Sequence, residues 1–239
     1  VLGQAVNDDM VRAGVASWLR TYIEMLALPS WSADDIRDRV STTGERHARA
    51  AYAGPGVVVA LPHLGNWDLA GAWACLSGFP VTTVAENLGP EEFAAFTAIR
   101  STLGMEVLRH DDPAVLSTLI GAIRRRRMVC LVSDRDLLGS GVPVPFAGLP
   151  VTMPAGPALV ARRTGATLIA AAARYTEDGM VLDISGPIPT RPGRDGLIAM
   201  TQEIADFFVA AIRRSPADWH LFQPFFDQHA DQLTAGANP

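Results

Sequence analysis

A histidine and an aspartate, spaced H-x-x-x-x-D, are the residues of this chain best placed to do chemistry. His63 and Asp68 lie in the stretch LPHLGNWDLAGAW, between an apolar run of strand length and a small-residue helical pattern. On one helix their side chains would point about 140° apart, so they can meet only if the helix starts near Asn66, a good N-cap. Gly65 gives the backbone the freedom for that turn. Asp68 would then hold one ring nitrogen of His63 and leave the other as a general base.

The same two residues also allow a purely structural interpretation. Asp68 could simply complement the helix dipole, and His63 could be a satisfied loop histidine. The sequence offers no enzyme nucleophile beside them, because it has no G-x-S-x-G elbow and neither Cys75 nor Cys130 lies in a basic setting. It also lacks a P-loop, a G-x-G-x-x-G motif and any metal-ligand spacing. The simplest chemistry is therefore that His63 deprotonates a hydroxyl of the substrate.

Two more polar residues occupy positions where ligands often bind. Arg100 opens RSTLG at the end of a predicted helix and could hold a phosphate or carboxylate, or only complement the helix C-terminus. Glu86 follows a predicted strand over residues 80–84, and ligands bind at the carboxyl ends of strands in such sheets. Each is ambiguous alone.

Paired acids follow another apolar strand. Asp134 and Asp136 come directly after residues 128–133, in the Gly- and Pro-rich segment SDRDLLGSGVPVPFAGLP. Such acids indicate a site more than packing, although a solvated turn is the alternative. No further acid or histidine follows at EF-hand spacing, which argues against calcium.

Composition places the chain among globular proteins. Of its 239 residues 49% are hydrophobic and 19% are charged, and the net charge of −5 does not suggest bulk nucleic-acid binding. The apolar runs are of strand length, too short for a transmembrane helix. Two cysteines in apolar surroundings favour free thiols and a reducing compartment. The chain begins without Met, so a targeting signal upstream would not be visible.

Strand and helix patterns alternate from residue 56 onward. This alternation predicts an α/β fold with a mostly parallel central sheet flanked by helices. We expect one domain over residues 1–239, with N-terminal helices in 1–53 and an α/β core in 54–239. Helices are expected over residues 9–27, 33–52, 66–77, 90–103, 113–125, 154–164 and 194–214, and strands over 57–61, 80–84, 105–108, 128–133, 167–173 and 180–184.

The first predicted helix is amphipathic. Its Trp18 and Tyr22 could sit at the headgroup level of a membrane, or the helix could pack on the core. Four arginines at residues 124–127 could contact anionic lipid, or form a solvated helix end.

Four segments together resemble a known family. HLGNWD, RSTLG, DRD and PAGPALVARRTGA resemble the lysophospholipid acyltransferase superfamily, in the branch of bacterial lipid A late acyltransferases. Within it, LPHLGNWDLAGAW and DWHLFQP resemble actinobacterial phosphatidylinositol mannoside acyltransferases. That branch fits Asp68 better, since the lipid A enzymes usually carry Glu there. The resemblance runs from about Val57 to His229 and implies the glycerol-3-phosphate acyltransferase-like fold.

The resemblance also implies an activity. A long-chain acyl group, palmitoyl in our expectation, would pass from acyl-CoA to a mannose hydroxyl of phosphatidylinositol mannosides, with acyl-CoA as co-substrate and no other cofactor. The enzyme would bind an anionic membrane surface peripherally, at the cytoplasmic face of the inner (plasma) membrane. Acylation of another membrane glycolipid or a lysophospholipid, hydrolysis of such lipids, and non-catalytic lipid binding are the alternatives.

Site residues follow from the same resemblance. His63 would be the general base, Asp68 would orient it, and Asp136 would be a second acid near the reaction centre. Contacts to the sugar, headgroup or substrate are expected from Glu86, Arg100, Asp134, Arg135 and His220. From apolar character, and not from the resemblance, we expect the acyl pocket beside His63 to be lined by Leu64, Trp67, Val142, Phe146 and Met153.

Overall fold

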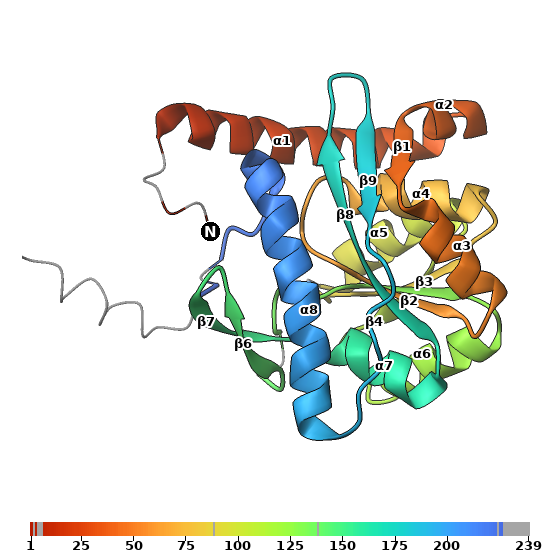
Figure 1. Ribbon diagram of the computed structural model, residues 1–239. Helices are drawn as coiled ribbons and strands as arrows, with labels where there is room; N and C mark the ends of the chain where they lie inside the picture. The colour runs from red at the N-terminus through yellow and green to blue at the C-terminus, as the bar shows by residue number, and fades with distance from the viewer. Residues whose placement is uncertain (2, 4–6, 88, 138, 224, 227–239) are drawn as a thin grey trace, which may run out of the picture.

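In the described part of the chain, the central sheet of the computed structural model contains seven strands, most of them parallel (Figure 1). They are β1 (Val40–Thr43), β2 (Val57–Leu61), β3 (Val81–Ala85), β4 (Glu106–Arg109), β5 (Met128–Val132), β8 (Thr167–Tyr175) and β9 (Met180–Ile184). Their order is β1-β9-β8-β2-β5-β3-β4, and only the β8–β9 pair is antiparallel. A separate antiparallel hairpin joins β6 (Val142–Phe146) to β7 (Leu149–Met153). The structure describes all residues except 2, 4–6, 88, 138, 224 and 227–239, so the end of the resemblance at His229 lies outside the described residues.

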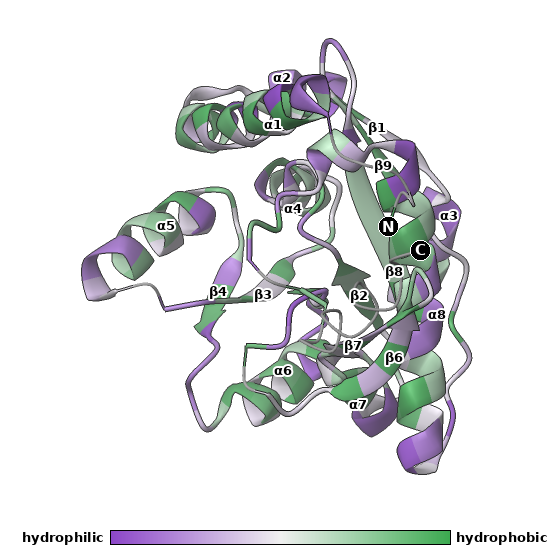
Figure 2. Ribbon diagram, turned by 90° about the vertical axis from the view of Figure 1, so that its left-hand side faces the viewer, coloured by the Kyte–Doolittle hydropathy of each residue, from purple (hydrophilic) through white to green (hydrophobic). Residues whose placement is uncertain are grey.

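Helices cover both faces of this sheet, as Figure 2 shows edge-on. One face packs against α6 (Val115–Arg124), α7 (Gly156–Thr164) and α8 (Gly193–Arg214), together with the hairpin. The other packs against α2 (Ala33–Asp38), α3 (Glu45–Ala53) and α4 (Trp67–Leu76). The remaining elements are α1 (Asp8–Ala27), α5 (Pro90–Thr102) and the short 3₁₀ turns η1 (Leu28–Ser30) and η2 (Pro216–Asp218). The predicted fold class, a single α/β domain with a mostly parallel sheet, is confirmed.

Side-chain alternation along the central strands supplies both cores. In β2, Val58 and Ala60 face α7, whereas Val57, Val59 and Leu61 face the α3 and α4 side. Strands buried on both faces read as continuous apolar runs, which is what residues 57–61 show.

Two local predictions were wrong. The single helix expected over residues 33–52 is broken by β1, whose sequence Val-Ser-Thr-Thr is β-branched and favours a strand. Gly44 then turns the chain with φ of +75°, where an added Cβ would overlap the carbonyl of Ile184. The Gly- and Pro-rich segment after β5, where no strand was expected, contains the β6–β7 hairpin. Its exposed Pro143 and Pro145 fit a two-stranded ribbon, where an unpaired edge needs no donor.

Helix ends near the site follow local rules. Asn66 caps α4, its Oδ1 accepting from the Leu69 N–H at 2.9 Å, as the sequence predicts. Gly65 has φ of +62°, and a Cβ there would lie 2.7 Å from the Ala173 carbonyl oxygen. Only glycine fits, so the loop carrying His63 is tightly specified.

Candidate active site

The imidazole of His63 is held by Asp134. His63 Nδ1 lies 2.6 Å from Asp134 Oδ1, and the His63 backbone N–H donates to Asp134 Oδ2 at 2.9 Å. The two residues follow β2 and β5, neighbouring parallel strands in which Leu61 is paired with Val132. The carboxylate of Asp134 is fully buried, whereas the His63 side chain keeps 28% exposure. This arrangement leaves Nε2 of His63 as the nitrogen that can take a proton from a substrate.

Charge and burial act in opposite directions on this pair. Burial alone would lower the pKa of His63, but the charge and hydrogen bond of Asp134 outweigh it and raise that pKa above its usual value. Burial would raise the pKa of Asp134, yet His63 and the other donors lower it overall. Asp134 therefore stays ionised and stabilises an imidazolium on His63, which is what a general base needs after it takes a proton.

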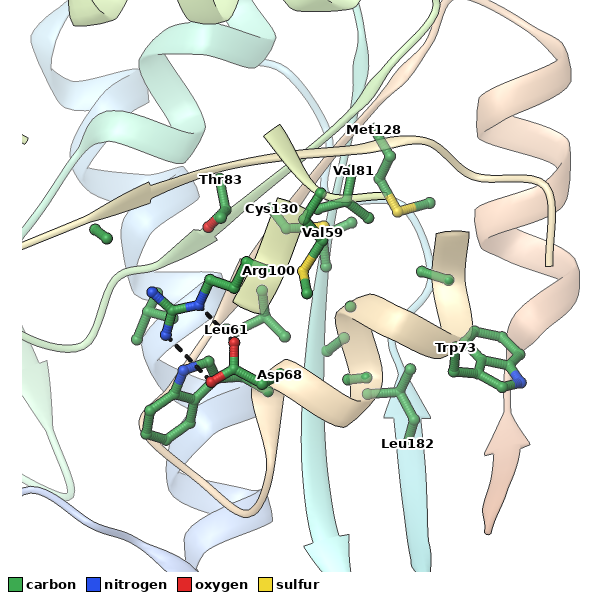
Figure 3. A pocket seen from close by; sticks show the side chains of 18 of the residues that line it. Val59, Leu61, Asp68, Trp73, Val81, Thr83, Arg100, Met128, Cys130 and Leu182 are labelled. Atoms are coloured by element: carbon green, nitrogen blue, oxygen red, sulfur yellow. Dashed lines mark hydrogen bonds and ion pairs between the residues drawn. The ribbon is translucent and has the colours of Figure 1, made fainter. Parts of the chain in front are cut away.

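Asp68 does not hold His63, which corrects our prediction. Its carboxylate accepts from Arg100 Nε at 2.6 Å and Nη2 at 3.1 Å, and both side chains are largely buried (Figure 3). Asp68 lies in the first turn of α4, while Asp134 reaches the imidazole from the adjacent strand. Arg100 is thus occupied by a protein carboxylate. The pair also fastens α5, none of whose residues is buried, to α4.

Of the other predicted polar residues, Glu86 and Arg135 lie beside His63, whereas Asp136 does not take the predicted place near the reaction centre. Glu86 lines the pocket and pairs with Arg135 at 3.0 Å, both partly exposed beside His63. Asp136 accepts from the Gly141 N–H at 2.7 Å in its own loop and does not line the pocket.

His220 does not line the pocket and is held by α1, contrary to its predicted substrate contact. Its Nε2 lies 3.0 Å from Ser17 Oγ and its Nδ1 3.5 Å from Thr21 Oγ1, both on α1. Burial lowers the pKa of His220 to about 4, so it is neutral at physiological pH. Its role in the fold is to join α1 to the C-terminal segment.

An apolar cavity of about 260 Å³ opens beside His63, between the sheet and α4. Trp67 packs edge-on against the partly exposed His63 at 5.4 Å between ring centroids, and these two residues mark the mouth of the cavity. The largely buried Asp68 and Arg100 also line it. In Figure 3, Met128 and Trp73 lie away from the ion pair. The deeper lining consists mainly of apolar side chains: Val59, Leu61, Ala70, Gly71, Trp73, Ala74, Phe79, Val81, Met105, Met128, Cys130, Ile169, Ala171 and Leu182.

The predicted acyl-pocket residues are mostly on the wrong face. Only Trp67 of the five lines this cavity. Leu64, Val142, Phe146 and Met153 are buried on the opposite side of the sheet, in the core with α8. The inward side chains of the hairpin fill that core, so they have no free surface to offer a ligand.

Sequence reasoning also missed several contributors. Thr21, Tyr22 and Met25 of α1 line the cavity, although α1 is some 40 residues before His63 in the chain. Trp219 donates to Asp134 Oδ2 at 2.9 Å. Among the described residues, no group of three or more His, Cys, Asp or Glu side chains is placed to hold a metal ion.

Comparison with known proteins agrees with the predicted resemblance. Residues 3–228 match the family model of the bacterial lipid A biosynthesis acyltransferases. A phosphatidylinositol mannoside acyltransferase of Mycolicibacterium smegmatis is 39% identical over 223 residues, which cover 92% of this chain and 73% of the relative. One from Mycobacterium tuberculosis is 37% identical over 226 residues, covering 92% and 71%. The chain therefore belongs to the bacterial lipid A biosynthesis acyltransferase family.

Proposed function

We propose that this acyltransferase moves a palmitoyl-type acyl group from acyl-CoA to a mannose hydroxyl of a phosphatidylinositol mannoside. The observation that carries the proposal is the His63–Asp134 pair, whose histidine lines a mainly apolar cavity. The pair supplies a base for a hydroxyl, and the cavity supplies a site for a hydrocarbon chain. The names of the two mycobacterial relatives favour this acceptor.

The chemistry needs only groups from this chain and the two substrates. Nε2 of His63 takes the proton of the mannose hydroxyl as its oxygen attacks the thioester carbonyl carbon. The C–S bond then breaks, and the leaving CoA thiolate takes the proton back from the imidazolium. Asp134 stabilises the imidazolium between these steps. The N-terminal turn of α4, close after His63, favours the negative charge that develops on the carbonyl oxygen.

The acceptor would contact the polar side of the cavity mouth. Glu86 and Arg135 are partly exposed there and can exchange their mutual ion pair for sugar hydroxyls. Arg100 and His220 are engaged by Asp68 and α1, so the proposal assigns them no direct substrate contact.

The test is product analysis by mass spectrometry. Purified protein is incubated with mannosylated phosphoinositides and either acyl-CoA or an acyl carrier protein thioester, with palmitoyl and shorter chains. We expect an acylated mannose from palmitoyl-CoA, and a loss of about 10²–10⁴-fold in His63→Ala. His47→Ala, a histidine outside the cavity lining, is the matched control. Near-normal transfer by a folded His63→Ala variant would show that His63 is not the general base.

Other products would identify the alternatives. Free fatty acid formed equally with and without acceptor would indicate a hydrolase. Acylation of another glycolipid or a lysophospholipid, but not of the mannoside, would change the acceptor. Acyl-chain binding without thioester cleavage would indicate a lipid-binding protein. Transfer from the acyl carrier protein thioester alone would show that the acyl donor is not acyl-CoA.

The first helix supports a peripheral membrane location as part of this proposal. An apolar stripe on α1 is 46–66% exposed, and its members are spaced to share one helix face: Val11, Val15, Leu19, Ile23 and Leu26. Tyr22, beside this stripe, lines the cavity mouth. A helix lying in the interface would bring lipid substrates to that mouth. Among the residues that the structure describes, no helix is long and apolar enough to cross a bilayer.

The arginines at 124–127 have a different setting. Arg125 and Arg127 pair with Glu106, and Arg126 donates to the carbonyls of Tyr52 and Gly54. The four arginines precede β5, whereas Asp134 follows it. This run therefore lies at the amino ends of the strands, and the site lies at their carboxyl ends. We therefore assign membrane binding to α1 and not to this run. The cytoplasmic face of the plasma membrane is proposed from the family resemblance alone.

Liposome flotation tests this location. Replacing Leu19 and Ile23 together by Ser should weaken flotation with anionic vesicles at least tenfold, because each exposed side chain contributes roughly 1.5–3 kcal/mol when buried. High salt should weaken it less, since Arg12 is the main exposed cation of α1. Arg124→Ser, away from the stripe, is the control. Unchanged flotation of the double variant would contradict the assignment.

A further inference from the structure

The chain from the end of η2 onward is hydrogen-bonded to the loop that carries His63. The Gly65 N–H donates to the Asp218 carbonyl at 2.9 Å, and the His220 N–H donates to the His63 carbonyl at 2.8 Å. Leu64 and Trp219 form an isolated antiparallel bridge between these bonds. A segment some 155 residues downstream of His63 thus fixes the backbone of the base.

Contacts to α1 fasten the same segment from its other side. Ser17 Oγ donates to Asp218 Oδ1 at 2.6 Å and lies 3.0 Å from His220 Nε2. The Tyr175 N–H at the end of β8 donates to Asp218 Oδ2 at 2.9 Å. Residues 218–220 are therefore held by three elements, and the side chain of Trp219 has a defined direction.

That direction leads to the buried acid. Trp219 Nε1 donates to Asp134 Oδ2 at 2.9 Å. The indole ring is packed against Phe146, nearly parallel at 6.1 Å between centroids, and edge-on against Phe225 at 5.3 Å. Trp219 does not line the cavity, and its indole N–H reaches the site through Asp134, while its backbone pairs with Leu64.

Asp134 needs hydrogen-bond donors such as the indole N–H, because its ionised carboxylate is fully buried and has no contact with solvent. Its Oδ1 faces His63 Nδ1, and its Oδ2 accepts from the His63 N–H and from Trp219. A buried carboxylate is kept charged only when hydrogen bonds satisfy its oxygens. The indole also opposes rotation of the carboxylate, which would move Oδ1 away from the imidazole.

We propose that Trp219 is a positioning residue for acyl transfer, whose N–H holds Asp134 in the orientation that serves His63. The role rests on the proposed function of His63 as the base. Its loss should act on the chemical step more than on substrate binding. Removing one hydrogen bond to a charged group predicts a fall in kcat of about 10-fold, with KM for the acyl donor unchanged.

A substrate-free measurement separates this proposal from the proposed function. Histidine resonances are followed by NMR against pH, and the signal of His63 is identified by its absence in His63→Ala. Replacement of Trp219 by 3-benzothienylalanine, which keeps the ring shape without the N–H, should shift the His63 titration midpoint by several tenths of a pH unit. The shift should be downward, because a carboxylate that turns away stabilises the imidazolium less. An upward shift would mean that the carboxylate keeps its place without the N–H, and it would overturn the positioning role.

The charged groups around His63 are the same in the parent protein and in the benzothienylalanine variant. Glu86, Arg135 and His220 lie close enough to act on His63 electrostatically, and Asp218 adjoins them. None is altered by the substitution, so a shift reports on the indole N–H. Trp31→Phe, a tryptophan stacked against Arg39 away from the cavity, is the control.

The kinetic arm uses Trp219→Phe and the benzothienylalanine variant. A roughly 10-fold lower kcat with unchanged KM in both variants supports positioning. Unchanged kcat and an unmoved His63 titration in the isosteric variant would overturn it and leave Trp219 as packing. A rise in KM alone would also overturn it, because Trp219 would then contact substrate. If no acyl transfer is found in the parent protein, the titration still decides the role of the indole.

Discussion

The helices that cover the two faces of the central sheet differ in the size of their buried side chains. Large residues fill the face under α6, α7 and α8, where Phe146, Phe208 and Met200 are completely buried. On the other face, which we call the small-residue face, the helix α4 itself contributes small side chains and reads Asp-Leu-Ala-Gly-Ala-Trp-Ala. The apolar cavity lies on that second face.

Residue size in the covering helices, not polarity, separates the closed face from the face with the cavity. Both faces are apolar, and the same strands supply both by alternation. Gly71 shows how closely the helix approaches its neighbours, since an added Cβ would overlap the sulfur of Met105. The small-residue face leaves space that a hydrocarbon chain can fill, at about 0.8 kcal/mol per buried CH₂. The large-residue face supplies stability without a ligand.

The largest expected effect is on kcat, and it concerns the His63–Asp134 pair at the carboxyl ends of β2 and β5, which belongs to neither face. Asp134→Asn keeps the shape of the buried acid but removes the charge that stabilises the His63 imidazolium. We expect kcat to fall about 10²–10⁴-fold, with the far-UV spectrum and acyl-chain binding retained. Asp136→Asn, two residues along in the same loop, should retain most activity because Asp136 bonds the Gly141 N–H. Equal losses in both variants would contradict the assignment of the partner acid.

Asp68 should show the reverse pattern, as a structural residue of the small-residue face. Asp68→Ala leaves the buried Arg100 guanidinium without its partner, which typically costs about 3–5 kcal/mol in the free energy of unfolding. Urea denaturation measures this loss. Asp34→Ala, an exposed partner of Arg37, is the control and should change stability by less than about 1 kcal/mol. Unchanged stability together with a large fall in kcat would restore the catalytic role predicted from the sequence.

The pH dependence should follow His63. A general base works when neutral, and Asp134 raises the pKa of His63 above its usual 6.5. The value of kcat/KM should therefore rise about tenfold per pH unit below that pKa and level off above it. In Asp134→Asn the midpoint should move to lower pH. A parent midpoint below 6.5 would show that burial outweighs the carboxylate.

Local signals in the sequence predicted the elements well and long-range contacts poorly. Asn66 and Gly65 act within a few residues, so the start of α4 and the turn before it were predicted from type and spacing. The partner of His63 was not, because Asp134 lies 71 positions away and meets it only through the pairing of β2 with β5. Asp134 was expected in the site, from its place after a strand, but in another role.

The position of the cavity shows a second limit. Strand alternation tells which residues share a face, but not which face stays open. Val142 and Phe146 were predicted to line the pocket from their apolar character, and they fill the closed core instead. The run of small residues in α4 was the available signal. The family resemblance came from motifs and is independent of this geometry.

One pair of adjacent residues tests the comparison of the two faces directly. Ala171 and Ala172 are neighbours in β8, but Ala171 lines the cavity and Ala172 lies in the closed core. Ala171→Leu should fill part of the cavity and shift the preferred acyl donor to a shorter chain, with little loss of stability. Ala172→Leu should overpack the core and destabilise by about 1–3 kcal/mol, without changing the preferred chain length. Competition between acyl donors and urea denaturation measure both effects. If the two substitutions destabilise equally and neither changes the chain preference, the cavity is an ordinary packing defect, and the acyl chain must bind elsewhere.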